Sequence, residues 1–200
     1  MCLQNEFMNK ALKYRKIITK EEISILELDK YSGEIVLVET KDALAKACAE
    51  ILECTIIGID TETKPSFRKG QINSVALLQI STDKKVYIIR LKLVAMSKEL
   101  ASIFSNEDII KVGIAVRDDL KDLKKLQAFD EKSVIDLNVL APKLGFESIG
   151  AKKLSALVLG IRISKRQQVS NWESAELTKA QITYAATDAW ICREIYLRLV

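Results

Sequence analysis

Apolar residues form short runs and helical stripes from about residue 34 to the C-terminus, and this pattern predicts alternating strands and helices. The most informative run is Ile56-Ile57-Gly58-Ile59, which leads directly into Asp60-Thr61-Glu62. A run without an interior polar residue predicts a strand buried on both faces, in the middle of an α/β sheet. Side chains two apart on a strand share a face, so Asp60 and Glu62 are expected to project to one side at its carboxyl end.

The remaining pattern places further elements around this strand. Thr40 is expected to cap a helix whose apolar residues recur at helical spacing, and Thr178 with Gln181 forms a capping box at the start of the C-terminal helix. Residues 1–33 are predicted to be a polar, helical lead-in without an assigned role. Strands are expected at 34–38, 56–62, 74–81, 86–90, 109–115 and 134–135. Helices are expected at 97–104 and 116–126, and also directly after Thr40 and after Thr178.

A strand, a hairpin and then alternating helices and strands indicate a mixed α/β fold. The hairpin strands are joined by a tight turn at 82–85. In such sheets ligands lie beyond the carboxyl ends of strands, which is where Asp60 and Glu62 are placed. The 200 residues suffice for one domain with a single sizeable core.

Composition narrows the class of protein further. The chain is 48% apolar and 29% charged, the balance of a globular protein, and no window is long and apolar enough for a membrane span. Charged residues near the N-terminus argue against a secretory signal, and the four cysteines have no metal-like spacing. These features predict a cytoplasmic protein with free thiols. The net charge of +4 suits a polyanionic partner, although basic residues also simply solvate surfaces.

Asp60 and Glu62 are candidates for metal binding. Two carboxylates on one face repel each other and lose hydration unless a cation lies between them. The chain has no histidine, so oxygen ligands point to Mg²⁺ or Mn²⁺ and away from zinc. The alternative is that these acids cap the next helix or solvate a turn.

Asp119 and Asp188 are acids on helical stripes that packing alone would keep apolar. Asp119 shares a predicted stripe with Leu123 and Leu126, although an acid there also favours a helix N-terminus through the macrodipole. Asp188 interrupts the C-terminal helix's apolar face, and a buried carboxylate needs a cation. Tyr184 lies one turn before Asp188, where ring packing is the alternative role. The predicted inward stripe of this helix is Ala185, Asp188, Cys192, Ile195 and Leu199.

Together these residues resemble the DEDD exonuclease superfamily, tyrosine subtype, which includes ribonuclease D and the exonuclease domain of the Werner syndrome helicase. The likeness covers about residues 34 to 200. It consists of motifs in family-like order: Asp60 to Phe67, Val75 to Ile80, Gly113 to Asp119, Leu157 to Gly160, Ser170-Asn-Trp172 and Tyr184 to Ala189.

The resemblance implies a ribonuclease H-like fold with a mixed sheet of five or six strands, and 3′→5′ hydrolysis of nucleic acid. It also implies a catalytic set in which Asp60 bridges two divalent cations, Mg²⁺ or Mn²⁺. Glu62 and Asp188 would hold the metal beside the attacking water, and Asp119 would support the second metal. Tyr184 would orient the water, because a phenol with an ordinary pKa near 10 is a poor base at neutral pH.

Substrate contacts are expected from two basic segments, at 64–69 and 165–166. Lysine and arginine side chains there would neutralise phosphates, and aromatic side chains would stack on nucleobases. The alternative is that the basic residues are solvated and that the tryptophan is core. The candidate substrate contacts are Lys64, Phe67, Arg68, Lys165, Arg166 and Trp172.

Three functions remain open from the sequence. A DNA exonuclease is expected, because the chain ends at Val200 without the helical RNA-binding domains of ribonuclease D. The alternatives are an RNA 3′-end trimming nuclease and a nucleic-acid-binding module that has lost catalysis. The preference for DNA or RNA as the substrate depends on a few contacts to the 2′-hydroxyl, and the sequence does not reveal these contacts.

Overall fold

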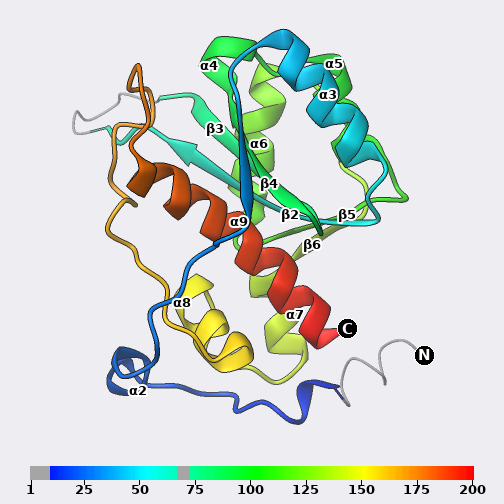
Figure 1. Ribbon diagram of the computed structural model, residues 1–200. Coiled ribbons are helices and arrows are strands. Elements are labelled where there is room, and N and C mark those ends of the chain that lie inside the picture. Colours follow the sequence, from blue (N-terminus) through cyan, green and yellow to red (C-terminus); the bar gives the residue numbers. More distant parts are fainter. Residues whose placement is uncertain (1–9, 67–72) are drawn as a thin grey trace.

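A computed structural model describes residues 10–66 and 73–200, and it contains a six-stranded mixed sheet in the order β1-β4-β3-β2-β5-β6 (Figure 1). This confirms the mixed α/β fold expected from the sequence. The strands are β1 (Glu34–Val38), β2 (Ile56–Thr63), β3 (Val75–Ser81), β4 (Lys85–Arg90), β5 (Ile110–Gly113) and β6 (Val134–Asp136).

The predicted central strand, β2, lies inside the sheet. It pairs antiparallel with β3 and parallel with β5, so it has hydrogen-bonded neighbours on both sides. The strands β2 to β6 form five of the six strands of the sheet, and β1 is the sixth, which pairs parallel with β4 at the edge. Pairing with β5 ends at Gly58, whereas the acids of β2 are paired with β3, Asp60 opposite Gln79 and Glu62 opposite Leu77.

Helices cover both faces of the sheet. The long α9 crosses one face, and α3, α5 and α6 lie on the other (Figure 1). The helices are α2 (Lys20–Ser24), α3 (Lys41–Leu52), α4 (Leu91–Val94), α5 (Lys98–Ser105), α6 (Val116–Leu126), α7 (Leu137–Lys143), α8 (Ala151–Leu154), a π-helical turn at Ser155–Leu159, and α9 (Lys179–Leu199).

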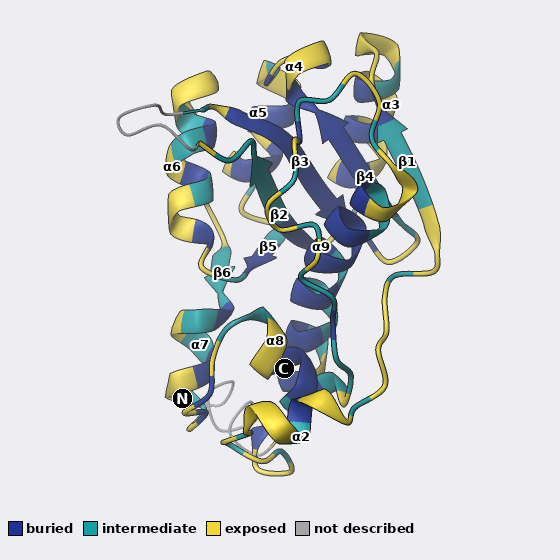
Figure 2. Cartoon of the chain, turned by 90° about the vertical axis from the view of Figure 1, so that its left-hand side faces the viewer, coloured by how far each residue is buried: buried dark blue, intermediate teal, exposed yellow. Residues whose placement is uncertain are grey.

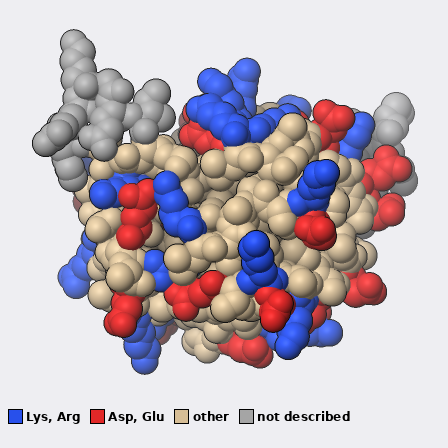
Figure 3. Space-filling model, turned by 90° about the horizontal axis from the view of Figure 1, so that it is seen from above, with Lys and Arg blue, Asp and Glu red and all other residues tan. Residues whose placement is uncertain are grey.

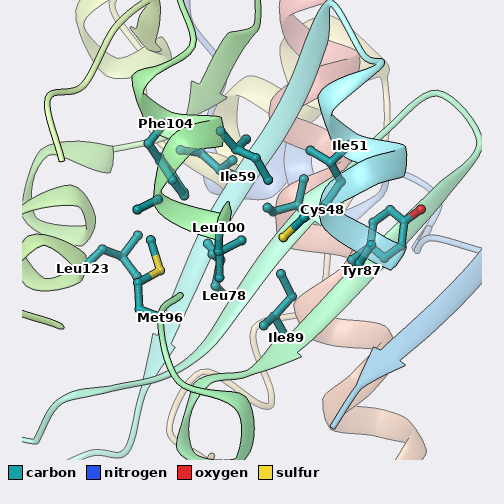
Figure 4. Packing of buried hydrophobic residues seen from close by; sticks show 14 of the residues in the cluster. Cys48, Ile51, Ile59, Leu78, Tyr87, Ile89, Met96, Leu100, Phe104 and Leu123 are labelled. Carbon is teal, nitrogen blue, oxygen red and sulfur yellow. The ribbon is translucent and has the colours of Figure 1, made fainter. Parts of the chain in front are cut away.

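The larger core lies between the sheet and α3, α5 and α6. Ile59 of β2 and Leu78 of β3 point into it, where they meet Leu100, Phe104 and Leu123 from the helices (Figure 4). Alternation along β2 therefore sends Ile57 and Ile59 to this side and Asp60 and Glu62 to the side of α9. The packing on one face fixes the direction of the acids on the other.

Gly58 allows α9 to approach β2 closely. A Cβ atom at this position would lie 2.1 Å from the Ala189 carbonyl oxygen and 2.9 Å from the Arg193 nitrogen. Only glycine leaves room for this contact. Because Ala189 follows Asp188 directly, the close approach brings the Asp188 carboxylate to the acids of β2.

Gly113 has the corresponding role for α6. A Cβ atom there would lie 2.7 Å from the Val116 Cβ and 3.3 Å from the Ile59 carbonyl oxygen. The chain then turns through Ala115, whose φ of 58° is left-handed, and enters α6 at Val116. This tight connection places Asp119, in the first turn of α6, beside β2.

Two sequence predictions in this region are corrected. The strand predicted at 109–115 spans only Ile110–Gly113, because the chain already turns through the left-handed Ala115 before α6 begins at Val116. The inward stripe of α6 is Val116, Leu120 and Leu123, and not Asp119, Leu123 and Leu126: Leu126 is 40% exposed. Asp119 lies half-buried on the margin of that stripe.

The helical lead-in predicted for residues 1–33 is also corrected. Within residues 10–33, which the structure describes, helix is limited to residues 10–11 and α2 (Lys20–Ser24). The segment is largely exposed, whereas α9 is largely buried (Figure 2). Its later part is tied to the domain, because Arg162 exchanges backbone hydrogen bonds with Glu27 and Asp29. The Tyr31 nitrogen donates to the Thr187 hydroxyl on α9, 3.0 Å away.

The described cysteines, Cys48, Cys54 and Cys192, are free thiols, as expected. Among the helices that the structure describes, none combines the length and apolar character that crossing a membrane requires.

Candidate active site

Asp60, Glu62 and Asp188 lie together between β2 and α9. Each offers a carboxylate oxygen, and these atoms lie within 4.8 Å of one another. The two acids of β2 lie near its carboxyl end, as expected, and the strand continues to Thr63, one residue past its predicted end. Asp188 is 6% exposed, and it belongs to the predicted inward stripe of α9, which is buried throughout.

Burial and mutual repulsion dominate the electrostatics of this cluster. Burial, followed by the charges of Asp188 and Glu62, raises the pKa of Asp60 well above its usual value. Burial and Asp188 raise the pKa of Glu62 to about 8. Burial also raises the pKa of Asp188, against the opposing effect of Lys165. The cluster therefore favours protons or cations at neutral pH.

Asp119 lies next to the cluster but outside its tightest group. The Thr61 hydroxyl donates a hydrogen bond to an Asp119 carboxylate oxygen. Burial raises the pKa of Asp119 to about 6, and this hydrogen bond opposes the rise. Asp119 also contributes to the raised pKa of Asp60. The structure thus gathers all four predicted acids, with Asp119 at the side away from Asp188.

Lys165 provides the positive charge of the site. Its ammonium group donates to both carboxylate oxygens of Asp188, at 3.0 and 2.9 Å, and to the Tyr184 hydroxyl at 3.3 Å. This charge partly offsets the repulsion among the acids. The sequence suggested Lys165 as a substrate contact, and the structure adds a direct bond to a site carboxylate.

Tyr184 lies one turn before Asp188 on α9, and its side chain is 7% exposed. Burial, Asp188 and Glu62 raise its pKa, so the phenol stays protonated at neutral pH. Its ring centroid lies 5.9 Å from that of Trp172. Trp172 is 1% exposed, which favours the core alternative: it supports the Tyr184 ring and offers almost no surface to a substrate.

The remaining substrate-contact candidates are scattered. Lys64 forms an ion pair with Glu173, with 3.6 Å between the charged atoms, and Arg166 is exposed. Phe67 and Arg68 lie outside the described residues. Their role as substrate contacts remains a prediction.

A cavity beside Tyr184 was missed by the sequence reasoning. It has a volume of about 440 Å³ and lies between α9, the Ser164–Gln167 loop and the lead-in. Three basic residues, Lys30, Arg166 and Lys179, line it, together with Asp29. Only Arg166 could be singled out beforehand, because Lys30 and Lys179 lie far apart in the chain and outside every motif.

Gln79 is a second residue that the sequence did not identify. It is 0% exposed and lies opposite Asp60 in the β2–β3 pair, on the same face of the sheet. Neither polar atom of its side chain has a hydrogen-bond partner among the described residues. Its place in the Val75 to Ile80 motif was the available signal, but an apolar run around one glutamine does not reveal its function.

Basic residues alone do not mark the site. On the face seen from above in Figure 3, lysine and arginine side chains are mixed with acidic ones. The small net charge of +4 is consistent with this mixture. The carboxylate cluster and its surroundings carry the functional argument.

A partly buried carboxylate cluster on a central strand of a ribonuclease H-like sheet is typical of the class of metal-dependent nucleases. The family model described as "3′-5′ exonuclease" matches residues 35–200. The chain therefore belongs to the 3′-5′ exonuclease family, a family that depends on divalent metal ions.

Relatives in the sequence comparison agree with this family. A provisionally named 3′-5′ exonuclease of Acanthamoeba polyphaga mimivirus is 36% identical over 166 residues, covering 74% of this chain and 40% of the viral protein. Ribonuclease D of Acidiphilium cryptum is 28% identical over 165 residues, covering 82% of this chain and 42% of that protein. The chain thus spans less than half the length of these relatives.

Solved structures share the fold. The Nibbler EXO domain of Aedes aegypti aligns with a TM-score of 0.77 and 26% identity, covering 86% of this chain and 90% of that one. Escherichia coli RNase D aligns with a TM-score of 0.76 and 24% identity, covering 84% of this chain and 44% of that one. This confirms the ribonuclease H-like fold and the exonuclease resemblance expected from the sequence.

Proposed function

We propose that this chain hydrolyses nucleic acid from the 3′ end, with Asp60, Glu62, Asp119 and Asp188 binding two divalent cations and Tyr184 orienting the water. The observation that carries the proposal is the carboxylate cluster, whose oxygens lie within 4.8 Å of one another between β2 and α9. Membership of the 3′-5′ exonuclease family supports it.

The residues present fit divalent cations. The donor set consists of carboxylate oxygens, which hard cations such as Mg²⁺ and Mn²⁺ prefer. Burial raises the pKa values of Asp60 and Asp188, so bound cations would stabilise the ionised form of these acids. Two bound dications would lower the pKa of a water and stabilise charge on the leaving oxygen.

The protein's own groups have separate tasks. Asp60 and Glu62 hold fixed positions because their part of β2 is paired with β3, and Asp188 is fixed by the contact of α9 with Gly58. Tyr184 keeps its proton, so its hydroxyl orients a water by hydrogen bonding and does not act as a base.

The cavity beside Tyr184 supports a path for the substrate strand. Lys30, Arg166 and Lys179 line it and would neutralise successive phosphates. Lys30 belongs to the lead-in, so this assignment gives residues 28–30 of that segment a role: they complete one wall of the cavity. The Thr183 hydroxyl on α9, which lines the cavity, would donate to a phosphate oxygen, whereas the Thr187 hydroxyl already donates to the Thr183 carbonyl oxygen.

The test is digestion of 5′-labelled DNA and RNA strands, single-stranded and recessed, with Mg²⁺, Mn²⁺ or EDTA. We expect a ladder that shortens from the 3′ end only with metal. Asp60→Ala should lose nearly all activity and Tyr184→Phe much of it, whereas Asp130→Ala, which removes an exposed acid outside the cluster, should be unchanged. If the chain digests neither polymer and binds no Mn²⁺, it is a binding module.

The same experiment shows whether the preferred substrate is DNA or RNA. Ribonuclease D among the relatives favours RNA, and DNA polymerase I of Aquifex aeolicus, 26% identical over 162 residues, favours DNA. The DNA preference expected from the sequence remains a prediction, and faster digestion of RNA would replace it with 3′-end trimming.

The cavity has its own test. Lys179→Ala and Arg166→Ala should raise KM and reduce the salt dependence of binding, with little change in kcat. Lys46→Ala on α3 is the matched control, because it removes an exposed base on the opposite face of the sheet. If all three variants bind oligonucleotides equally, the strand does not pass through this cavity.

A further inference from the structure

A groove of about 660 Å³ lies along β6, between α6 and α7. In Figure 2 these two helices lie on either side of β6, at one edge of the molecule. Val134, Ile135 and Asp136 all line the groove. None of the four clustered acids, Tyr184 or Lys165 lines it, so it is separate from the candidate active site.

The groove follows the open edge of the sheet. Successive strand side chains point to opposite faces, and accordingly Val134 packs against the core on the α6 side while Ile135 packs against the core on the other side. A cavity that touches all three residues of β6 must therefore lie at the strand's edge. Within the described residues β6 is the last strand of the sheet and pairs only with β5.

The lining of the groove combines aliphatic residues, here called its floor, with basic residues, here called its rim. Val116 and Leu120 of the floor are buried, whereas Val139 is 55% exposed. The aliphatic lining residues are Val116, Leu120, Val134, Ile135, Val139 and Leu140, and the basic ones are Arg117, Lys121, Lys124 and Lys143.

The acids of the groove are already engaged. Glu131 pairs with Lys124. Asp136 accepts hydrogen bonds from the backbone nitrogens of Ala115, at 3.0 Å, and Asn138, at 2.8 Å. Among the described residues, Arg117, Lys121 and Lys143 form no ion pair, so three positive charges surround an apolar channel without a counter-charge.

We propose that this groove binds an extended peptide segment of a partner protein, and that the peptide pairs with the free edge of β6 as an additional strand. The peptide has aliphatic residues flanked by Asp and Glu. An open strand edge offers backbone groups to an extended chain, and side-chain pockets on both sides supply specificity. The peptide's aliphatic residues cover the floor, and its carboxylates meet Arg117, Lys121 and Lys143.

Two other occupants fit less well. A second copy of this chain would bring one basic rim against another, which is repulsive. A single-stranded nucleic acid would match the charge, but its bases stack on aromatic rings, and the lining contains none. The combination of an aliphatic floor, a basic rim and a free strand edge favours an acidic, aliphatic peptide.

The test uses fluorescence anisotropy with three labelled probes and the full chain: the peptide Glu-Asp-Val-Ile-Val-Leu-Asp-Glu, its analogue with lysine at every acidic position, and a dT oligonucleotide. We expect the acidic peptide to bind and the lysine analogue to bind at least tenfold more weakly. Amide hydrogen exchange at 134–136 should slow when the acidic peptide is bound.

Val139→Asp and Lys121→Glu should each weaken binding of the acidic peptide at least tenfold and leave nuclease activity unchanged. Both positions are exposed, so neither change disturbs the core. Lys46→Glu on α3 is the matched control and should bind as wild type does.

Three results would overturn the proposal. One is failure of the acidic peptide to bind. Another is binding that Val139→Asp leaves intact, which would show attraction by charge alone. The third is that the oligonucleotide binds preferentially, or that the chain forms a concentration-dependent dimer, and that Val139→Asp abolishes this binding. The groove would then bind nucleic acid or a second copy of the chain. Activity of the same preparation on labelled strands tests the proposed nuclease function separately.

Discussion

Lys165 bonds to both carboxylate oxygens of Asp188, at 3.0 and 2.9 Å, although Asp188 also belongs to the carboxylate cluster. The lysine side chain is 19% exposed and that of Asp188 only 8%, so water screens this pair weakly. A divalent cation bound at the cluster would therefore compete with the ammonium group for the same oxygens. On the proposed function, we expect Lys165 to stabilise the acids without metal and to oppose metal binding.

Removing Lys165 separates these two effects. Lys165→Ala should bind Mn²⁺ severalfold more tightly, because the competing charge is gone, and should hydrolyse substrate at least tenfold more slowly, because the contact to Tyr184 is lost. Calorimetric titration with Mn²⁺ and single-turnover digestion measure the two quantities. Weaker Mn²⁺ binding in this variant, with Lys46→Ala unchanged, would contradict the competition.

The contact of Gly58 with Ala189 gives a second prediction. The Cβ of Gly58→Ala would lie 2.1 Å from a backbone oxygen, so α9 must shift. Overpacking of this kind costs about 1–3 kcal/mol of unfolding free energy. Because α9 carries Asp188, we expect activity to fall on the order of a hundredfold, as small misplacements in active sites do. Denaturant unfolding and digestion rates measure both.

A matched control shows whether lost stability alone lowers activity. Gly145 has a φ of 84° and lies in a loop outside the site, so Gly145→Ala strains the backbone without moving α9. It should lose stability and keep its activity. Full activity in Gly58→Ala, at any stability, would show that the close approach of α9 is not needed.

Stability of the metal-free protein should fall as pH rises from about 4.5 to 8. The folded pKa of Glu62 is about 8, above its usual 4.5, so over this range the unfolded chain releases a proton that the native state retains. Asp119, with a pKa of about 6 against 3.8, adds to the fall in the lower part of the range. Thermal unfolding in EDTA measures the slope.

Metal should reverse this trend. Mn²⁺ binds ionised carboxylates, so the rise in Tm that it causes should be larger by several degrees at pH 8 than at pH 5. Glu62→Gln removes one titrating group and should flatten the metal-free slope. Equal Tm shifts at the two pH values would argue against metal binding by these acids.

The sequence predicted those parts of the site that follow from strand and helix periodicity. Asp60 and Glu62 share a face because side chains alternate along β2, and Asp188 faces inward because the stripe of α9 has helical spacing. The capping box of Thr178 and Gln181 fixed the start of that helix correctly, with both hydrogen bonds present. These are local signals, so one sequence is sufficient to read them.

The missed features depend on tertiary contacts. The left-handed turn at Ala115 rotates α6 so that Leu120 faces the core and Leu126 does not. The lead-in contains few apolar residues in register, so it follows the surface through backbone hydrogen bonds to Arg162 and forms no long helix within its described part. The pairing of Lys165 with Asp188 joins a loop to a helix, and no spacing in the chain encodes it.

Gln79 provides the last prediction. Its amide is fully buried opposite Asp60, without a hydrogen-bond partner among the described residues, and such a group costs roughly 1–3 kcal/mol. Directly opposite residues in an antiparallel pair have Cβ atoms about 5 Å apart, so the amide is within reach of the Asp60 carboxylate. We therefore expect Gln79→Leu to be as stable as wild type or more stable, and severalfold less active, with weaker Mn²⁺ binding. Leu78→Met, which changes the neighbouring side chain on the opposite face, is the control and should keep full activity. A Gln79→Leu protein with unchanged activity and Mn²⁺ affinity would show that the amide does not support Asp60.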